Sequence, residues 1–338
     1  MVTMREVALR AGVTKQTVSN VLNRPEIVSP QTAEQVRRAI AELGFSPNLV
    51  ARGLATGRTR IIGLLVPTTD HPFYGAMVEE IEDRLNAAGF GLLLSTTRGD
   101  AARGRRQIDA LASRAIDGLI VAGDTDVELY VSHLDEAPFP YVLCAWEVSA
   151  PQGACISTID YVEAGTLAGR HVAELGHKSA AIVADLPAHG RRASGMVAAL
   201  EERGVAVEVL SAGGGTVAAG RLVGAQVLAG PARPSAVIAS NDLLALGVLD
   251  AARDAGLQVP GMLSVVGIDD AAARLGHSEL TSVALPVREM AAEASKQILE
   301  SLSSTVVLGR SAIAQPHLVV RRTSAAPTPA QQSEPLSA

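Results

Sequence analysis

The sequence has few aromatic residues and almost no cysteine. Its 338 residues include one Trp, four Tyr, four Phe and two Cys. The two cysteines, Cys144 and Cys155, are too few for a disulfide scaffold, and their spacing is not that of metal ligands. No apolar run reaches the roughly 18 residues needed to cross a bilayer, and the first residues do not resemble a secretory signal. We therefore expect a cytoplasmic protein without a metal site or a membrane partner.

The sequence also lacks the usual signatures of catalysis and nucleotide binding. It contains no GxxxxGK[ST], no HExxH and no GxSxG motif. The run 211–220 matches a dinucleotide-binding fingerprint at Gly213, Gly215 and Ala218, but no acidic residue follows about 20 positions later to hold a ribose. We interpret this run as a loop, and we expect neither an enzyme nor a bound cofactor.

The charge of the chain is unevenly distributed. The whole chain carries −6, which by itself argues against a nucleic-acid partner. Residues 1–60, however, hold nine Lys or Arg and four Glu, giving +5, whereas residues 61–338 carry −11. A basic head on an acidic body is typical of a nucleic-acid module joined to an effector module. The length and the hydrophobic fraction of 48% favour two or three globular domains.

Residues 3–44 have the pattern of three short helices around one small core. Thr or Ser hydroxyls can cap the second and third helices, and glycines end the first and third. We expect these helices at residues 4–11, 15–22 and 30–43. Because a tight glycine turn joins the first two, the pattern matches a helix-turn-helix.

The second of these helices has two different faces. Val18, Val21 and Leu22 form an apolar face, while the opposite face carries long polar side chains suited to base edges in a major groove. That polar face consists of Lys15, Gln16, Ser19 and Asn20. The alternative is a three-helix interaction module whose polar face is only solvated.

The segment 47–57 links the head to the body. Asn48 can cap one or two helical turns, and Gly57 can end them. Gly53 lowers helix stability by roughly 1 kcal/mol relative to Ala, so a helix this short needs a partner to hold it. The segment is either a plain linker or a hinge that folds on DNA.

From residue 61 onward, short apolar runs alternate with amphipathic stretches. This alternation predicts parallel sheets with helices on both faces. About 260 residues are too many for one open sheet, so we expect two doubly wound halves, with a first crossing near 158–160. The apolar runs are 61–67, 90–96, 118–123, 141–146, 180–185, 207–212, 236–240 and 263–269.

Ligands of open α/β sheets lie beyond the carboxyl ends of the strands. Trp146, the only Trp, follows the fourth apolar run, and it is either a ligand platform or a core residue. Asp160 ends another apolar run, where its carboxylate could accept hydrogen bonds from a polyol. His71 has no second ligand at a usable spacing and is not expected to bind metal.

The chain as a whole resembles the lac repressor (LacI/GalR) family of transcription regulators. The resemblance covers roughly residues 3–324 and is most specific in the head. It rests on the head segment VALRAGVTKQTVSNVLNRPEIVSPQT and on NDLLALG, LSVVGIDD, TSVALPVREM and HLVVRRTS further along. It implies a helix-turn-helix head, a hinge, and a two-lobed body of periplasmic-binding-protein type.

The resemblance also implies which residues contact DNA. The base-reading positions correspond to Lys15, Gln16 and Asn20, where the family often has Arg in place of Asn20. Since Arg prefers guanine and Asn prefers adenine, the resemblance does not determine the identity of the outer bases of the operator. Phosphate contacts are implied for the hydroxyls of Thr3, Thr14, Ser29 and Thr32. In the hinge, the expected DNA-binding positions are Asn48, Ala51 and Leu54, with Leu54 wedged into the minor groove.

For the cleft, the resemblance implies an effector site. Phe73 and Tyr74 are expected to line it, although either ring could instead seal the end of the sheet. An arginine that points into the cleft corresponds to Arg192, with its neighbour Arg191 as a rival. Asn241 and Asp269 are expected to contact the ligand, and the alternative for Asn241 is a helix cap. Asp242 and Asp270 are expected to be structural.

These observations predict a ligand-responsive regulator, most often a repressor in this family. We expect residues 1–46 to form the DNA-binding domain, 47–60 the hinge, 61–324 the body and 325–338 a disordered tail. The expected partners are a pseudo-palindromic operator, a second copy of the chain, and a sugar, sugar derivative or nucleobase. The main alternative is a cytosolic binding protein of periplasmic type without a DNA role, and a Rossmann-type enzyme is the third interpretation.

Overall fold

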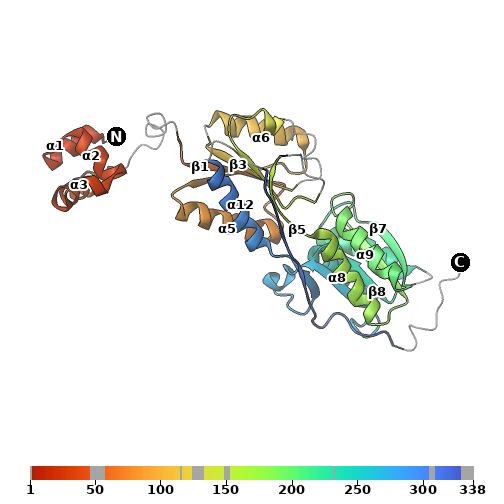
Figure 1. Ribbon diagram of the computed structural model, residues 1–338. Coiled ribbons are helices and arrows are strands. Elements are labelled where there is room, and N and C mark those ends of the chain that lie inside the picture. The colour runs from red at the N-terminus through yellow and green to blue at the C-terminus, as the bar shows by residue number, and fades with distance from the viewer. Residues whose placement is uncertain are drawn as a thin grey trace. The chain divides into compact units, whose positions relative to one another are not determined.

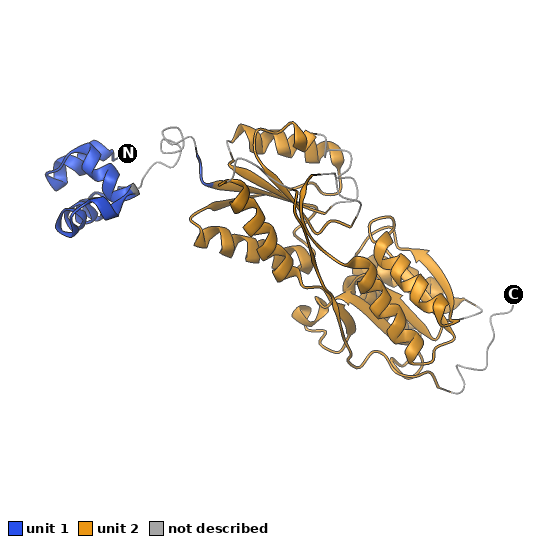
Figure 2. Cartoon of the chain, in the orientation of Figure 1, with its two compact units in different colours: residues 1–60 blue, residues 61–338 orange. Residues whose placement is uncertain are grey.

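The chain divides into two compact units, residues 1–60 and residues 61–338 (Figure 2). The computed structural model describes residues 2–45, 58–114, 116–123, 133–147, 153–230, 233–303 and 309–328. Among these residues, no helix combines the length and the apolar character that a membrane span requires.

The first unit is a small three-helix domain, drawn in red in Figure 1. Its helices are α1 (Met4–Ala11), α2 (Lys15–Asn23) and α3 (Pro30–Leu43), with a 3₁₀ turn, η1, at Pro25–Ile27. Val7, Val18 and Val36 have no exposed surface and form the centre of the core. The predicted three helices are therefore confirmed, each within a residue of its expected bounds.

Side chains close the start of each helix of the head. The Thr3 hydroxyl accepts a hydrogen bond from the Glu6 N–H, and the Glu6 carboxylate in turn accepts one from the Thr3 N–H. The Thr14 hydroxyl accepts from the Thr17 N–H at 3.1 Å, and the Ser29 hydroxyl from the Thr32 N–H at 3.3 Å. Each cap contributes about 1 kcal/mol, which matters in a core of this size.

The second unit contains two six-stranded sheets with helices on both faces (Figure 1). The N-lobe sheet is parallel throughout and has the order β11-β5-β4-β3-β1-β2. Helices α5 (Pro72–Ala87), α6 (Ala101–Ser113) and α12 (Val287–Ser301) pack against it. Its strands are β1 (Ile61–Val66), β2 (Gly91–Thr96), β3 (Gly118–Ala122), β4 (Tyr141–Cys144), β5 (Cys155–Ile159) and β11 (Ser311–Ala314).

The C-lobe sheet has the order β12-β10-β9-β8-β6-β7, and only β12 runs antiparallel to its neighbour. Its strands are β6 (Ser179–Ala184), β7 (Ala206–Ser211), β8 (Ala236–Ala239), β9 (Ser264–Asp269), β10 (Thr281–Ala284) and β12 (His317–Val319). Its helices are α8 (Tyr161–Glu174), α9 (Gly190–Glu202), α10 (Val217–Ala229), α11 (Asp242–Asp254) and the 3₁₀ helix η2 (Ala272–Leu275). The prediction of two doubly wound halves is confirmed.

Four strands, β5, β10, β11 and β12, were not among the eight runs predicted to be strands, and only the apolar run that ends at Asp160 marks β5. They are three to five residues long and carry Ser, Thr or His, so they give a weak hydrophobic pattern. Their pairing depends on strands that are far away in the sequence, as for β11, which pairs with β5. Pattern alone does not detect such strands.

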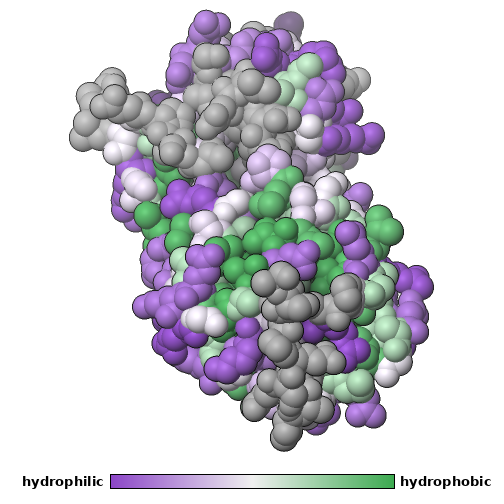
Figure 3. Space-filling view, turned by 90° about the vertical axis from the view of Figure 1, so that its right-hand side faces the viewer, coloured by the Kyte–Doolittle hydropathy of each residue, from purple (hydrophilic) through white to green (hydrophobic). Residues whose placement is uncertain are grey.

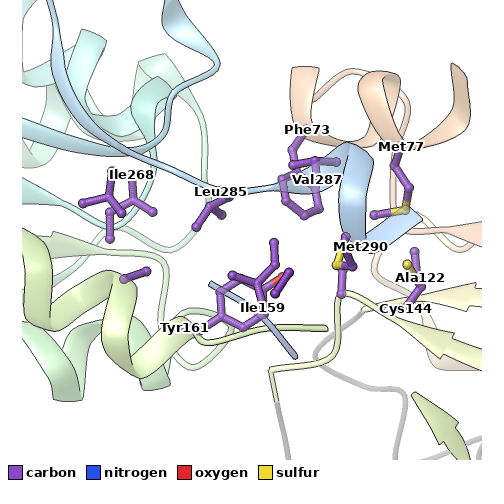
Figure 4. Packing of buried hydrophobic residues seen from close by; sticks show 14 of the residues in the cluster. Phe73, Met77, Ala122, Cys144, Ile159, Tyr161, Ile268, Leu285, Val287 and Met290 are labelled. Carbon is purple, nitrogen blue, oxygen red and sulfur yellow. The ribbon is translucent and has the colours of Figure 1, made fainter. Parts of the chain in front are cut away.

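The chain passes between the lobes three times, after β5, after β10 and after β11. The first passage falls at Asp160, which caps α8. A continuous apolar core spans the junction, and Figure 4 shows Ile159, Tyr161 and Leu285 between the two lobes. At the other end, the Ala325 N–H donates to the Ser264 hydroxyl, so a residue assigned by its sequence to the disordered tail is held by the body.

Glycines allow the helices of the C-lobe to approach closely. A Cβ at Gly165 of α8 would lie 1.9 Å from the carbonyl oxygen of Arg192, and one at Gly195 of α9 would lie 2.1 Å from that of Val162. Backbone therefore packs against backbone at the start of α9, which fixes the position of Arg192. A side chain of any size at Gly165 has to push the two helices apart.

We predict that Gly165→Ala lowers the free energy of unfolding by about 1–3 kcal/mol, because the added methyl group overpacks the α8–α9 contact. Urea unfolding of the purified protein measures this change. Gly75→Ala is the matched control, since Gly75 lies in α5 with no heavy atom near its virtual Cβ. The control should be neutral or slightly stabilising, and equal losses in both variants would contradict the prediction.

Candidate functional site

A cavity of about 510 Å³ lies between the two lobes of the body, at the carboxyl ends of their strands. Residues that follow β1, β3 and β4 line it from the N-lobe, and residues that end or follow β6, β8 and β9 line it from the C-lobe. This is the location where open parallel sheets bind ligands. We call this cavity the cleft.

Arg192 forms the centre of the cleft. Its Nε donates to Glu147 Oε1 at 2.8 Å, its Nη2 forms an ion-pair contact with the same oxygen at 2.6 Å, and its Nη1 donates to Asp269 Oδ1 at 3.0 Å. Nη1 also donates to the carbonyl oxygen of Ser240 at 3.0 Å. Because Glu147 belongs to the N-lobe and Arg192 and Asp269 to the C-lobe, this ion pair connects the lobes.

The surroundings of Arg192 hold it in place and exclude water. Its guanidinium lies 4.7 Å from the centre of the Tyr161 ring, close enough for a cation–π contact. The Arg192 side chain is only 6% exposed and that of Asp269 only 2%. Asp269 also has a positive φ of 116°, a strained conformation for a residue other than glycine. Strain of this kind persists only where neighbouring contacts fix the residue.

Burial changes the protonation of the two carboxyl groups. Desolvation raises the pKa of Glu147 from 4.5 to about 7, although Arg192 opposes the shift. Desolvation likewise raises the pKa of Asp269 from 3.8 to about 6. The second oxygens, Glu147 Oε2 and Asp269 Oδ2, are buried and have no hydrogen-bond partner in the part of the chain that the structure describes.

His71 faces Asp269 from the opposite lobe. Its Nδ1 accepts a hydrogen bond from the Phe73 N–H, and its Nε2 lies 3.7 Å from Asp269 Oδ2. Desolvation and the charge of Arg192 lower the pKa of His71 to about 4. His71 is therefore neutral at physiological pH, and its Nε2 also lies 3.5 Å from Asn241 Nδ2.

Five of the seven residues that the sequence predicts for the effector site line the cleft. Arg192 does so, whereas Arg191 is exposed, which decides between the two arginines. Asn241 lines the cleft and is the cap of α11, since its Oδ1 accepts from the Leu244 N–H, and its Nδ2 donates to the Gly215 carbonyl oxygen. Contact of these residues with a ligand remains a prediction. The five are Phe73, Tyr74, Arg192, Asn241 and Asp269.

The other two predicted residues, Trp146 and Asp160, do not line the cleft. Trp146 is 3% exposed and belongs to the apolar core that also contains Leu65 and Leu143. The adjacent Glu147 takes the position at the cleft, because successive residues of an extended chain point in opposite directions. Asp160 is the cap of α8, where its carboxylate accepts from the Glu163 N–H.

Several cleft residues are not among those predicted from the sequence. Glu147 and Asp185 follow strands β4 and β6, so the strand-end rule that selected Trp146 could have found them. Gly215 and Thr216, from the run interpreted as a loop, also line the cleft. Tyr161 follows β5 by two residues, so the same rule places it near the cleft, but its contact with Arg192 of another helix has no signal in the sequence.

Asp242, expected to be structural, is fully buried outside the cleft lining. Its carboxylate accepts hydrogen bonds from the N–H groups of Ala271 and Ala272 and from the Ser282 hydroxyl. This network fixes the loop after β9, next to Asp269. Asp270 pairs with Arg321 at 2.6 Å and is also structural.

In the head, α2 presents its polar face to solvent as predicted. Lys15 and Gln16 are exposed, and Gln16 Nε2 donates to Asn20 Oδ1 at 3.1 Å. The hydroxyls of Thr3, Thr14 and Ser29 cap the three helices, so each lies at a helix N-terminus, a location that favours phosphate. Thr32 Oγ1 accepts from the Ser29 hydroxyl. The hinge positions Asn48, Ala51 and Leu54 lie outside the described residues.

The raised pKa of Glu147 predicts a pH effect on stability. In the unfolded chain this carboxyl ionises at its ordinary pKa, whereas in the folded protein it keeps its proton up to about pH 7. The folded state then binds more protons, so the contribution of Glu147 to stability decreases as pH rises from about 5 to 7. Glu147→Gln does not titrate, and its stability relative to wild type should increase over that range. Urea unfolding at several pH values measures this, with the exposed Glu201→Gln as control. A difference independent of pH would contradict it.

Both units match known proteins. Residues 3–48 match the family described as bacterial regulatory proteins, lacI family, and residues 170–324 match a periplasmic binding protein-like domain. The chain is 33% identical over 334 residues to the HTH-type transcriptional repressor PurR of Erwinia tasmaniensis, covering 96% of this chain and 97% of the relative.

Two solved structures are also similar. The lac repressor dimer bound to operator and the anti-inducer ONPF has 26% identity and a TM-score of 0.83, covering 96% of this chain and 99% of that chain. The complex of the transcriptional regulator CelR with cellobiose has 29% identity and a TM-score of 0.70, covering 96% and 100%. The match of the head goes against a binding protein without a DNA role. The chain therefore belongs to the LacI family of bacterial regulatory proteins, and it is a DNA-binding, ligand-controlled transcription regulator rather than an enzyme.

Proposed function

We propose that this protein is a homodimeric repressor that binds a pseudo-palindromic operator in the cytoplasm and is controlled by a small molecule in the cleft. The observation that supports this proposal most directly is the ion pair between Glu147 and Arg192, which connects the two lobes. A ligand that competes for these groups favours one arrangement of the lobes over another. The cleft is therefore a site where binding energy can become a conformational change.

On the DNA side, the polar face of α2 is the reading surface. Lys15, Gln16 and Asn20 are proposed to contact base edges, and the caps Thr3, Thr14 and Ser29, together with Thr32, to contact phosphates. Residues 48–56 are proposed to fold against the minor groove, with Leu54 between the central base pairs. Since the hinge joins the head to β1 of the N-lobe, a movement of the lobes alters the hinge spacing. Ligand and operator affinities are then reciprocally coupled.

A second copy of the chain is proposed to cover apolar edges of the body. Strands β2 and β7 lie at corresponding outer edges of the two sheets, and both expose apolar side chains. Leu94 of β2 and Val209 of β7 are exposed, and Leu222 of α10 is 74% exposed. Figure 3 shows an apolar area, coloured green, on one face of the C-lobe. Exposed apolar edges are normally covered by a partner, and a homodimer also explains a pseudo-palindromic operator.

The proposed effector is a small hydroxylated or nitrogenous metabolite. Arg192, Asn241 and the carboxyl groups offer polar contacts, and Phe73, Tyr74 and Tyr161 offer apolar faces. The similarity to a regulator solved with cellobiose and to a repressor named PurR supports this range of ligands. The direction of the response, induction or co-repression, follows from the sign of the coupling.

Selection of DNA from random duplexes tests the reading head. We predict that the full chain enriches an inverted repeat and that Gln16→Ala weakens its binding by about 5- to 150-fold, the cost of one base contact. Gln35→Ala on α3 is the control, because this exposed residue lies outside the reading face. Gel retardation measures both variants. If Gln16→Ala binds the selected site as tightly as wild type, α2 is not the reading helix.

Substitution in the cleft should separate the response to a ligand from DNA binding. A thermal-shift screen of sugars, sugar acids, polyols and nucleobases supplies the ligand. We predict that Asp269→Ala and Arg192→Ala abolish the change in operator affinity that this metabolite causes, while operator binding without it persists. The exposed neighbour Arg191 provides the control Arg191→Ala. Full response in either cleft variant would contradict the proposed site.

A further inference from the structure

The cleft contains more acidic than basic groups. Its two histidines add no positive charge, because burial lowers the pKa of both His71 and His189. An anion that enters the cleft therefore meets a surplus of carboxyl groups. Among the described residues that line the cleft, the ionisable groups other than histidine and tyrosine are Asp70, Glu147, Asp185, Asp269 and Arg192.

Most of the hydrogen-bonding capacity of Arg192 is already used within the protein. A guanidinium has five N–H groups; three of them donate hydrogen bonds to protein acceptors, and Nη2 forms an ion-pair contact with Glu147. Nε and Nη2 bind Glu147, and Nη1 binds both Asp269 and the carbonyl of Ser240. Recognition of a carboxylate or phosphate by arginine depends on a fork of two N–H groups, and Arg192 has only Nη2, itself in contact with Glu147, to offer an anion.

Three of the helix N-termini at the cleft are capped by side chains, whereas α9 also begins there, after His189, without a side-chain cap. Helices α5, α10 and α11 begin there, and their first N–H groups would otherwise attract an anion. Side chains accept these N–H groups instead: His71 from Phe73 at 3.3 Å, Thr216 from Ala219 at 3.2 Å and Asn241 from Leu244 at 2.8 Å. The positive ends of these helices are thus already capped by the protein.

Within the described part of the chain, the cleft lacks hydrogen-bond donors for two of its buried carboxyl oxygens. Glu147 Oε2 and Asp269 Oδ2 are buried oxygens without a partner among the described residues, and both are acceptors when their carboxyl groups are ionised. A buried acceptor without a hydrogen bond is unfavourable, and a ligand that supplies an N–H or O–H group to each oxygen removes this cost. The two oxygens belong to different lobes, so a ligand that binds both also bridges the lobes.

We propose that the cleft selects an effector with at least two hydrogen-bond donors and no negative charge, and that Glu147 and Asp269 exclude phosphorylated and carboxylated metabolites. Unphosphorylated sugars with neighbouring hydroxyls and neutral bases with neighbouring N–H groups meet this description. This inference rests on the proposed function of the cleft and specifies the chemical class of its effector.

Inorganic phosphate tests the exclusion of anions without knowledge of the natural effector. In Glu147→Gln/Asp269→Asn, both carboxyl groups become neutral amides. Arg192 keeps its positive charge but loses its two acidic partners. We expect phosphate at about ten times its Kd to raise the Tm of this variant by about 3 °C. The wild type should show no rise relative to chloride at the same ionic strength.

The control for charge is Glu201→Gln/Glu202→Gln, which removes two exposed carboxylates from the same helix, α9, outside the cleft. It should behave like the wild type. Where the double cleft variant does not fold, Glu147→Gln alone should show a smaller rise with phosphate. Stabilisation of the wild type by phosphate, or an equal rise in the control, would overturn the proposal.

Matched metabolites test the donor requirement. Thermal-shift titrations compare ribose with ribose 5-phosphate, glucose with glucose 6-phosphate and with gluconate, and inosine with inosine 5′-monophosphate. We expect every scaffold that stabilises the wild type to do so only in its neutral form. An anionic member that stabilises more than its neutral counterpart contradicts the inference. These measurements contain no DNA, so such a result would leave operator binding, and with it the proposed function, intact.

Discussion

The architecture of the body depends on one buried arginine. Arg192 pairs with Glu147 from one lobe and Asp269 from the other, and little water reaches any of the three groups. A buried ion pair of this kind adds little to stability, because desolvation of the charges offsets their attraction. Its value lies in specificity, since removal of either partner leaves an uncompensated charge. The packing of α8 against α9, made possible by Gly165 and Gly195, keeps the guanidinium at the junction.

Much of this protein could be predicted from its sequence, and the limits have physical causes. The three helices of the head were predictable because their caps and glycines are local signals, as at Thr14 and Gly44. Eight of the twelve described strands were predictable from apolar runs. The other four strands and the packing of Tyr161 against Arg192 were not, because they depend on contacts between distant segments. Trp146 shows a second limit of prediction from sequence. The end of β4 was correctly predicted to lie at the cleft, but the residue that lines the cleft there is Glu147, the neighbour of Trp146.

Charge is divided along the chain in a way that suits the two tasks. The basic residues of the head can approach phosphate, whereas the acidic body is repelled by DNA. Inside the body, acidic residues also outnumber basic ones among the residues that line the cleft around Arg192. A regulator whose cleft is poor in available positive charge reads hydrogen-bond donors rather than net charge. The two units thus distinguish their partners by opposite electrostatic properties.

The three passages of the chain between the lobes have a consequence for biosynthesis. The head consists of local contacts within about forty residues, so it can fold as soon as it leaves the ribosome. The N-lobe cannot, because its sheet lacks β11 (Ser311–Ala314) and its face lacks α12 until nearly the whole body has been translated. The nascent chain therefore carries a finished DNA-reading domain on an unfinished body. The strands at the start of the N-lobe are made first and can complete their sheet only when β11 has been made.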